Sequence, residues 1–341
     1  MRKKILVTGA SGFIGGYIVA ELLEHGWEVV GLDNYSKYGR VAKEHDSHPR
    51  YNLHHGDAKD VNLLEELLAD CTQMLAAASM VGGIGYFHEL AYDLLAENER
   101  ICAASFDAAI RAFRRGTLEK ITVLSSSMVF ESATVFPTPE GAELTSPPPL
   151  STYGLQKLVC EYYARGAHQQ YGLPYTIVRP FNCVGIGELK TRYDSETREG
   201  NIRLGMSHVV PDLIRKVLAG QDPLRILGDG RQVRHYTYGG DLARGIRLAI
   251  EHPDATNEDF NLATEASTTV LELAELVWSK INPERPLRIV CEEPFQYDVQ
   301  NRVPDCSKAR RVLGFEAQTS LSTMLDELIP WVRAQLQQGT I

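Results

Sequence analysis

The sequence predicts an α/β protein in which a doubly wound parallel sheet carries helices on both faces. Short apolar runs alternate with helical patterns from the N-terminus to about residue 180, as they do in parallel α/β sheets. Runs such as Ile5–Val7 are apolar throughout, which is typical of strands covered on both faces. The glycine-rich stretch Thr8–Gly15 then joins this first strand directly to a helical pattern.

The first turn has the composition of a dinucleotide site. Gly9 permits the tight turn, Gly12 lets the backbone approach a pyrophosphate, and Gly15 lets the helix lie against the strand. The second apolar run, 28–32, ends in Asp33, where a carboxylate can accept hydrogen bonds from the adenosine ribose. A carboxylate would repel a 2′-phosphate, so the sequence predicts NAD rather than NADP as the cofactor.

The later elements are expected in a fixed order. They are a loop with a short helix (34–50), a strand (51–57), a helix (61–68), a strand end of small residues (74–78), a long helix (92–114), a strand (121–127) and a proline-rich loop (136–149). Asp57 follows the third strand, where it can either meet the adenine amino group or cap the next helix.

Candidate catalytic side chains lie in the last part of this strand and helix pattern, between residues 125 and 157. Ser125–Ser127 end a predicted strand, and ligands of open α/β sheets bind outside such strand ends. Tyr153 and Lys157 are four residues apart, which places them on one face of a helix. A nearby ammonium stabilises phenolate and brings the pKa of a tyrosine toward the working range of a base.

Composition excludes several classes of protein. The 341 residues carry a net charge of −9 with both signs interspersed, which argues against a nucleic-acid or anionic membrane surface. The six cysteines show neither a CxxC pair nor zinc spacing, and are expected to be reduced thiols of a cytosolic protein. The chain starts directly with a strand and has no apolar run of membrane-spanning length, so we expect a soluble cytoplasmic protein without a signal peptide.

The motifs together resemble one family. Thr8–Gly15, Asp33, Ser125–Ser127, Tyr153–Lys157 and Arg179–Asn182 resemble the extended short-chain dehydrogenase/reductases, and more narrowly the nucleotide-sugar epimerases and dehydratases. The turn at Gly228–Arg234 and the stretch Arg302–Phe315 are similar to the C-terminal motifs of that family. The resemblance covers essentially the whole chain.

This resemblance implies a fold with two parts. A Rossmann-type NAD-binding domain is expected over residues 1–182, with returning segments at about 228–262. A smaller α/β domain over 183–341 is expected to bind a nucleoside diphosphate sugar. Members of the family usually dimerise through two helices per subunit, which here would be the helices near 92–114 and 153–171.

The resemblance also implies roles for single residues. Tyr153 is expected to be the catalytic base, Lys157 to lower the pKa of Tyr153 and hold the nicotinamide ribose, and Ser126 to orient the sugar hydroxyl. The residues expected to contact NAD are Gly9, Ser11, Gly12, Phe13, Ile14, Gly15, Asp33, Asn34, Asp57, Ala58, Ala76, Ala77, Ala78, Asn98, Ser125, Tyr153, Lys157 and Pro180. The residues expected to contact the substrate are Gly82, Ser127, Asn182, Val209, Arg234 and Arg302.

The reaction is inferred by elimination. Relatives that dehydrate, decarboxylate or epimerise at C3 and C5 place a carboxylate or a cysteine at the positions matching Ser127 and Met128, and a thioether transfers no protons. A 4-epimerase that passes through a 4-keto intermediate therefore remains. The glycine loop Val81–Tyr86 resembles that of the 3,5-epimerases, or it only makes room for the sugar ring. Lys190 lies near the acid–base lysine of those enzymes, or it is an ordinary solvated loop lysine. A keto-sugar reductase, a decarboxylase and a catalytically silent NAD-binding sensor or scaffold also stay open.

Several features have no assigned role. His88 and His208 can be acid–base groups or ordinary hydrogen-bonded histidines, and Cys183 is expected to pack rather than to react. The charged insertion 188–204 is expected to form a lid or shoulder over the sugar. The nucleotide base and the sugar are not specified by these motifs.

Overall fold

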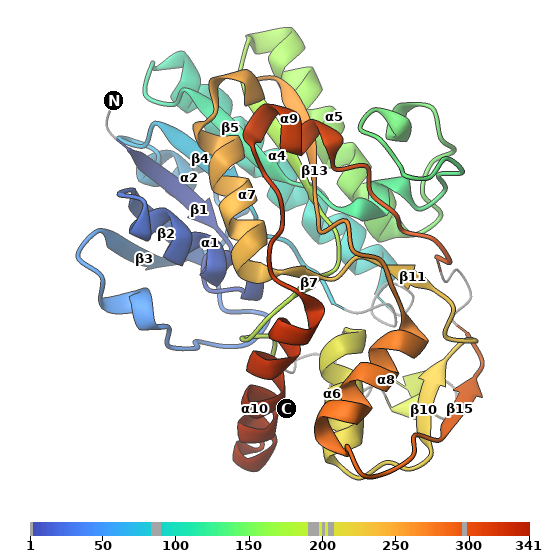
Figure 1. Ribbon diagram of the computed structural model, residues 1–341. Coiled ribbons are helices and arrows are strands. Elements are labelled where there is room, and N and C mark those ends of the chain that lie inside the picture. Colours follow the sequence, from blue (N-terminus) through green and yellow to red (C-terminus); the bar gives the residue numbers. More distant parts are fainter. Residues whose placement is uncertain (1–2, 83–89, 190–197, 200–201, 204–207, 295–298) are drawn as a thin grey trace.

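The computed structural model describes residues 3–82, 90–189, 198–199, 202–203, 208–294 and 299–341. Its centre is a seven-stranded sheet in which all neighbouring strands are parallel (Figure 1). Across the sheet the strands are β3 (Tyr51–His55), β2 (Glu28–Asp33), β1 (Lys4–Thr8), β4 (Gln73–Ala76), β5 (Lys120–Leu124), β6 (Tyr175–Pro180) and β13 (Glu258–Leu262). This order confirms the doubly wound α/β class, because the chain starts in the middle and winds outward both ways.

Helices cover both faces of the sheet. One face packs against α1 (Phe13–Glu24), α7 (Gly239–Glu251) and α9 (Ser307–Leu313). The other packs against α2 (Val61–Leu67), α4 (Ala91–Arg114) and α5 (Thr152–Tyr171). Within β1, Ile5 and Val7 enter the first core and Leu6 the second, all fully buried, which explains why the strand is apolar throughout.

Three predicted strands end earlier than expected. The strand predicted over 51–57 ends at His55, the one over 74–78 at Ala76, and the one over 121–127 at Leu124. At the last of these, Ser126 leaves the sheet because its Oγ accepts a hydrogen bond from the Met128 N–H at 3.2 Å and caps a short 3₁₀ helix. The serine cluster therefore lies in the turn beyond the strand.

A smaller core forms below the sheet in Figure 1. It consists of α6 (Val209–Leu218), α8 (Val270–Ile281), α10 (Leu321–Gln338) and a parallel pair of strands, β10 (Leu224–Leu227) and β15 (Ile289–Glu292). We call this part the C-terminal region. Short elements elsewhere are η1 (Glu44–Ser47), η2 (Ser127–Phe130), η3 (Ala142–Leu144), β7 (Cys183–Val184), β8 (Arg198–Glu199), β9 (Ile202–Arg203), β11 (Val233–Arg234), β12 (Thr237–Tyr238), η4 (Pro253–Ala255) and β14 (Thr268–Thr269).

The chain crosses between the two cores more than once. Within the segment 228–262, Tyr236 packs in the C-terminal region, whereas α7 and β13 pack in the sheet. The chain returns again at α9, whose Ala309 and Leu313 are buried beside α7. Among the described helices, none combines the length and the apolar character that a bilayer-spanning segment needs.

Candidate active site

A cavity of about 1100 Å³ lies beyond the carboxyl ends of the sheet strands, between the sheet and the C-terminal region. Its walls come from the glycine-rich turn, from the segments that follow β2, β4, β5 and β6, and from α4, α5, α6 and β10. Of the residues predicted to contact cofactor or substrate, all but Ala76 and Asn98 line this cavity. We call it the cleft.

The glycine-rich turn has the geometry that its sequence predicts. Gly9 has a φ of +73°, and its N–H donates to Leu32 O at 2.8 Å. A Cβ at Gly15 would lie 2.1 Å from Gly9 O, so only glycine lets α1 approach the turn this closely. Gly12 precedes α1 as its N-cap and lines the cleft, so the N–H groups at the start of the helix face an anion site.

Asp33 is held rigidly at the edge of the cleft. Its two carboxylate oxygens accept hydrogen bonds from Ser11 N at 2.9 Å and from Tyr35 N at 2.8 Å. Each oxygen keeps a second lone pair, so the carboxylate can still accept from ribose hydroxyls. A negative charge fixed at this place fits NAD and opposes a 2′-phosphate.

The segment after β4 follows the wall of the cleft with its backbone. Thr8 Oγ1 accepts hydrogen bonds from Ala77 N and Ala78 N, both at 3.1 Å, which keeps these two small residues at the cleft. Ala76 still belongs to β4 and packs against the second core instead of lining the cleft. Asn98 is also set back, because its amide is bonded to both Met80 N (2.7 Å) and Met80 O (2.9 Å). It therefore positions the cleft wall rather than forming it.

Tyr153 and Lys157 line the cleft from the first turns of α5. The helix starts at Ser151, whose Oγ caps it by accepting from Gly154 N at 3.0 Å. Lys157 Nζ donates to Leu124 O at 2.9 Å and lies 5.9 Å from the centre of the Tyr153 ring. Ser126 lies on the cleft wall two residues after Leu124, so phenol, ammonium and hydroxyl share one cavity.

A buried ionic network, which the sequence analysis missed, supports this group. Ser125 Oγ donates to Glu161 at 2.6 Å, and Glu161 accepts two hydrogen bonds of 2.7 Å from Arg179. Arg179 is fully buried and also pairs with Glu143 at 2.9 Å and Asp259 at 2.7 Å. Glu161 follows Lys157 by the same four residues that separate Lys157 from Tyr153, and this spacing could have revealed it.

The network governs the protonation of its members. Burial by itself would lower the pKa of Arg179, but the carboxylates of Glu161, Asp259 and Glu143 together outweigh burial and raise the pKa. Burial would raise the pKa of Asp259, but the cations of Arg179 and Lys308 together outweigh burial and lower the pKa. Arg179 and Asp259 therefore stay charged at neutral pH, as expected for a buried and mutually paired ion pair.

The far side of the cleft carries the predicted substrate residues. Asn182 has a φ of +39°, and its buried Oδ1 has no hydrogen-bond partner among the described residues, so a ligand can satisfy it. Arg234 and Arg302 also line the cleft, and a guanidinium is a side-chain group that suits a diphosphate. Gly82, Ser127 and Val209 lie on the same cavity wall.

An apolar wall lines the cleft beside Tyr153. Tyr153, Met128 and Leu94 form one buried cluster, and Met80, Val81 and Leu90 pack against it. Met128 Sδ is 2.8 Å from Arg302 Nη2. Met128 therefore links the apolar cluster that contains Tyr153 to the guanidinium of Arg302.

The remaining candidates fall in three groups. His88, Lys190 and most of the insertion 188–204 lie outside the described residues. His208 lines the cleft and pairs with Glu188. Burial raises the pKa of the Cys183 thiol well above neutrality, which keeps it protonated and suits packing rather than nucleophilic chemistry.

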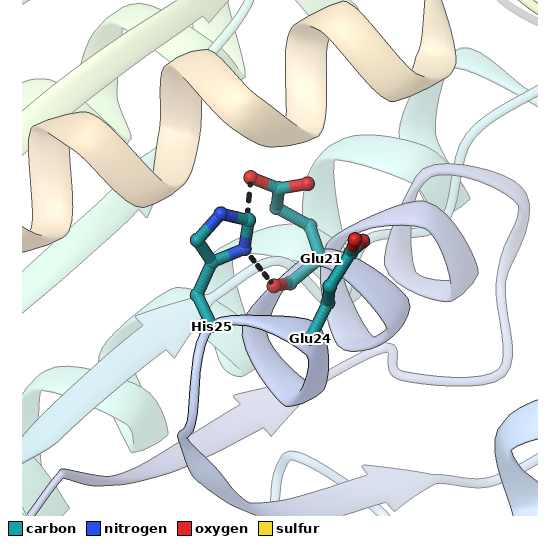
Figure 2. Close-up of side chains that lie close together, drawn as sticks. All are labelled: Glu21, Glu24 and His25. Atoms are coloured by element: carbon teal, nitrogen blue, oxygen red, sulfur yellow. Dashed lines mark hydrogen bonds and ion pairs between the residues drawn. The ribbon is translucent and has the colours of Figure 1, made fainter.

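One acidic cluster lies away from the cleft. At the end of α1, His25 Nδ1 approaches the Glu21 carboxylate at 3.4 Å with Glu24 beside it (Figure 2). Glu21 also pairs with Arg247 at 2.7 Å, so its charge is already neutralised within the protein. Charge pairing accounts for this arrangement, and it has no bearing on the cleft.

These features define a protein that binds a dinucleotide beside a tyrosine, a lysine and a serine suited to proton transfer. The chain belongs to the NAD dependent epimerase/dehydratase family, whose model matches residues 5–263. The cofactor of this protein is therefore NAD, and the residues at the glycine turn and Asp33 fit it.

Known proteins of this family match almost the whole chain. A UDP-glucose 4-epimerase of Halalkalibacterium halodurans is 28% identical over 345 residues, covering 96% of this chain and 95% of the relative. UDP-glucuronic acid decarboxylase 5 of Arabidopsis thaliana is 28% identical over 322 residues, covering 93% and 86%. The crystal structure of a Thermotoga maritima UDP-glucose 4-epimerase with UDP-glucose superimposes with a TM-score of 0.79 at 27% identity, covering 98% of this chain and 99% of that one.

Proposed function

We propose that the protein is an NAD-dependent epimerase that inverts C4 of a nucleoside diphosphate sugar through a transient 4-keto sugar. The observation that carries this proposal is the content of the cleft. Tyr153, Lys157 and Ser126 line it together, and Met128 rather than an acid or a thiol lies next to them. The similarity to UDP-glucose 4-epimerases supports the same reading and favours a UDP-sugar.

The chemistry follows from the side chains. NAD, when bound, accepts a hydride from the sugar and returns it. The Tyr153 oxygen takes the proton from the C4 hydroxyl as the hydride leaves, and gives it back when the ring has turned its other face. Ser126 orients that hydroxyl, and Lys157 supplies positive charge near the phenolate. Arg234, Arg302 and Asn182 hold the diphosphate while the sugar turns.

Met128 limits what can follow oxidation. A keto-sugar loses water or inverts at C3 and C5 only with a group that moves protons near those carbons. A thioether does not supply such a group, and the neighbouring wall residues Met80, Val81 and Leu90 are apolar. Since these described wall residues offer no such group, return of the hydride to the 4-keto sugar is favoured.

A second candidate comes from the guanidinium of Arg302. It lies at the apolar wall, beside Met128, where a sugar carboxylate could pair with it. Together with the similarity to a UDP-glucuronic acid decarboxylase, this favours an acidic sugar and decarboxylation as the alternative reaction.

A panel of UDP-, GDP-, CDP- and dTDP-sugars, acids included, tests the proposal. In deuterated water, we expect one C4-inverted product that contains no solvent deuterium on carbon, because the hydride returns internally. Deuterium on a product carbon would indicate enolisation and a 3,5-epimerase. Loss of carbon dioxide would indicate a decarboxylase, stoichiometric use of NADH a reductase, and absence of any product a sensor or scaffold.

A further inference from the structure

Lys43 turns back from the start of η1 onto the first turn of α1. Its Nζ donates to Gly12 O at 3.3 Å. A Cβ at Gly16 would lie 2.6 Å from this Nζ, so the ammonium occupies the space that the glycine leaves. A Cβ at Gly187, in the loop after β7, would lie 4.0 Å from the same Lys43 Nζ. The ammonium is therefore packed between the cofactor helix and that loop.

The backbone around Lys43 is fixed independently of its side chain. The Lys43 N–H donates to the carboxylate of Asp46 at 3.0 Å, which closes the short helix η1. Next to it, the ring of His45 packs edge-on against Tyr51 of β3, with 5.3 Å between ring centres. A change at the Lys43 side chain should therefore leave this segment in place.

This position is electrostatically unfavourable for a cation in the absence of an anion. The start of a helix carries partial positive charge, and Lys43 adds a full charge beside it. Burial lowers the pKa of Lys43, and the charges of Asp46 and Asp33 only partly oppose this effect. Among the described residues, the hydrogen bond recorded for its ammonium goes to a carbonyl, not to a carboxylate.

We propose that Lys43 is a cofactor-binding residue, whose ammonium supplies positive charge to the dinucleotide pyrophosphate from behind the glycine-rich turn. Gly12, whose carbonyl accepts from the ammonium, lines the cleft, whereas Lys43 does not. It therefore acts through space at the anion site on α1, and its charge becomes favourable when the pyrophosphate arrives. This inference rests on the NAD dependence of the family and is independent of the sugar and of the reaction.

Binding measurements on nucleotide-free full-length protein test the proposal. Calorimetry should show that Lys43→Met weakens ADP-ribose and NAD about tenfold at low ionic strength, the size expected for one charge nearby in a partly buried site. Adenosine, which lacks phosphate, should bind both proteins equally. Lys280→Met is the matched control, because Lys280 pairs with Asp326 on the surface at 2.6 Å.

Thermal unfolding separates this role from a structural one. We expect Lys43→Met to leave the Tm of the nucleotide-free protein unchanged or higher, and to reduce the rise in Tm that NAD produces. Equal affinity for ADP-ribose in the variant and the parent would overturn the proposal. An equal loss for ADP-ribose and adenosine would also overturn it, because the damage would then not concern the pyrophosphate.

Discussion

Tyr153 and Lys157 were predictable because a helix fixes the spacing of their side chains. Four residues along α5 bring both into the cleft, and the strand before them brings Ser126 to the same place. Asn98, also predicted to contact NAD, does not line the cleft, because its position is set by a distant contact. Its amide bonds to Met80, eighteen residues earlier, and no local pattern reveals a contact set by the path of a loop.

At this scale, Tyr153→Phe is expected to lower turnover by roughly 10²-fold or more, because the proposed reaction loses its base. NAD should stay bound, since the glycine turn and Asp33 are unchanged. Product analysis gives the turnover, and the absorbance of the purified protein gives the NAD content. Tyr162→Phe, on the same helix with an exposed side chain, serves as the control. Unchanged turnover in Tyr153→Phe would remove this tyrosine from the mechanism.

The helix α5 acts as a unit that holds the serine turn at two successive residues. Lys157 bonds the carbonyl of Leu124 and Glu161 bonds the hydroxyl of Ser125, one turn farther along. Arg179 then pairs with Glu161, Glu143 and Asp259, of which Glu143 comes from η3 and Asp259 from β13. The sequence predicted the helix and the strand, but not this network, because its members are far apart in the chain.

We expect Glu161→Gln to lower the free energy of unfolding by about 3 kcal/mol, because one partner of a buried ion pair becomes neutral. Urea unfolding measures the loss. The double variant Glu161→Gln/Arg179→Met should lose less than the sum of the two single variants, since the two side chains contact each other. Strictly additive losses would contradict the direct coupling of this pair.

Lys120 gives an element-level prediction about pH. It starts β5 and donates to Ala249 O and Ile250 O at the end of α7, both at 3.0 Å. Burial lowers the pKa of Lys120 to about 8 from its usual value of 10.5. Between these two pH values, Lys120 is protonated in the unfolded chain but has lost its proton in the folded protein. The contribution of Lys120 to the free energy of unfolding therefore increases as the pH rises.

The pH effect is isolated by a difference between two proteins. Relative to Lys120→Met, the parent should gain up to about 3 kcal/mol of unfolding free energy between pH 8 and 10. Comparing the two removes the contribution of buried tyrosines and cysteines, whose unfolded forms titrate in the same range. Parallel pH profiles would mean that the folded state does not disfavour the charged amine.

For the whole molecule, the sequence predicted the fold class, but it did not predict how the chain returns to the first core at its C-terminal end. Alternating apolar runs reveal a parallel sheet, because each strand and its helix are adjacent in sequence. The return of the chain at α9 has no comparable sequence pattern, because Ala309 and Leu313 pack against residues of α1 and α7, which are distant in sequence. Contacts between distant segments are visible only in the folded structure.

The proposed dimer is a whole-molecule prediction. Apolar or aromatic side chains stay exposed on α4 and α5, among them Tyr92 (77%), Leu155 (36%) and Tyr162 (56%). If these helices form the dimer interface, Tyr162→Glu should shift the mass in sedimentation from dimer toward monomer. Val290→Glu, at an exposed position on β15, should leave it unchanged. A monomeric parent protein would contradict the proposal.

The return of the chain at β13 and α9 has a consequence for biosynthesis. The ribosome releases the glycine turn and Asp33 early, but the edge strand β13 and the helix α9 emerge much later. At ordinary elongation rates, α9 follows β6 by roughly ten seconds. During that interval, the apolar residues of α1 and α7 that α9 will cover stay exposed on the nascent chain. A nonsense codon before Phe315 would leave this apolar surface exposed permanently.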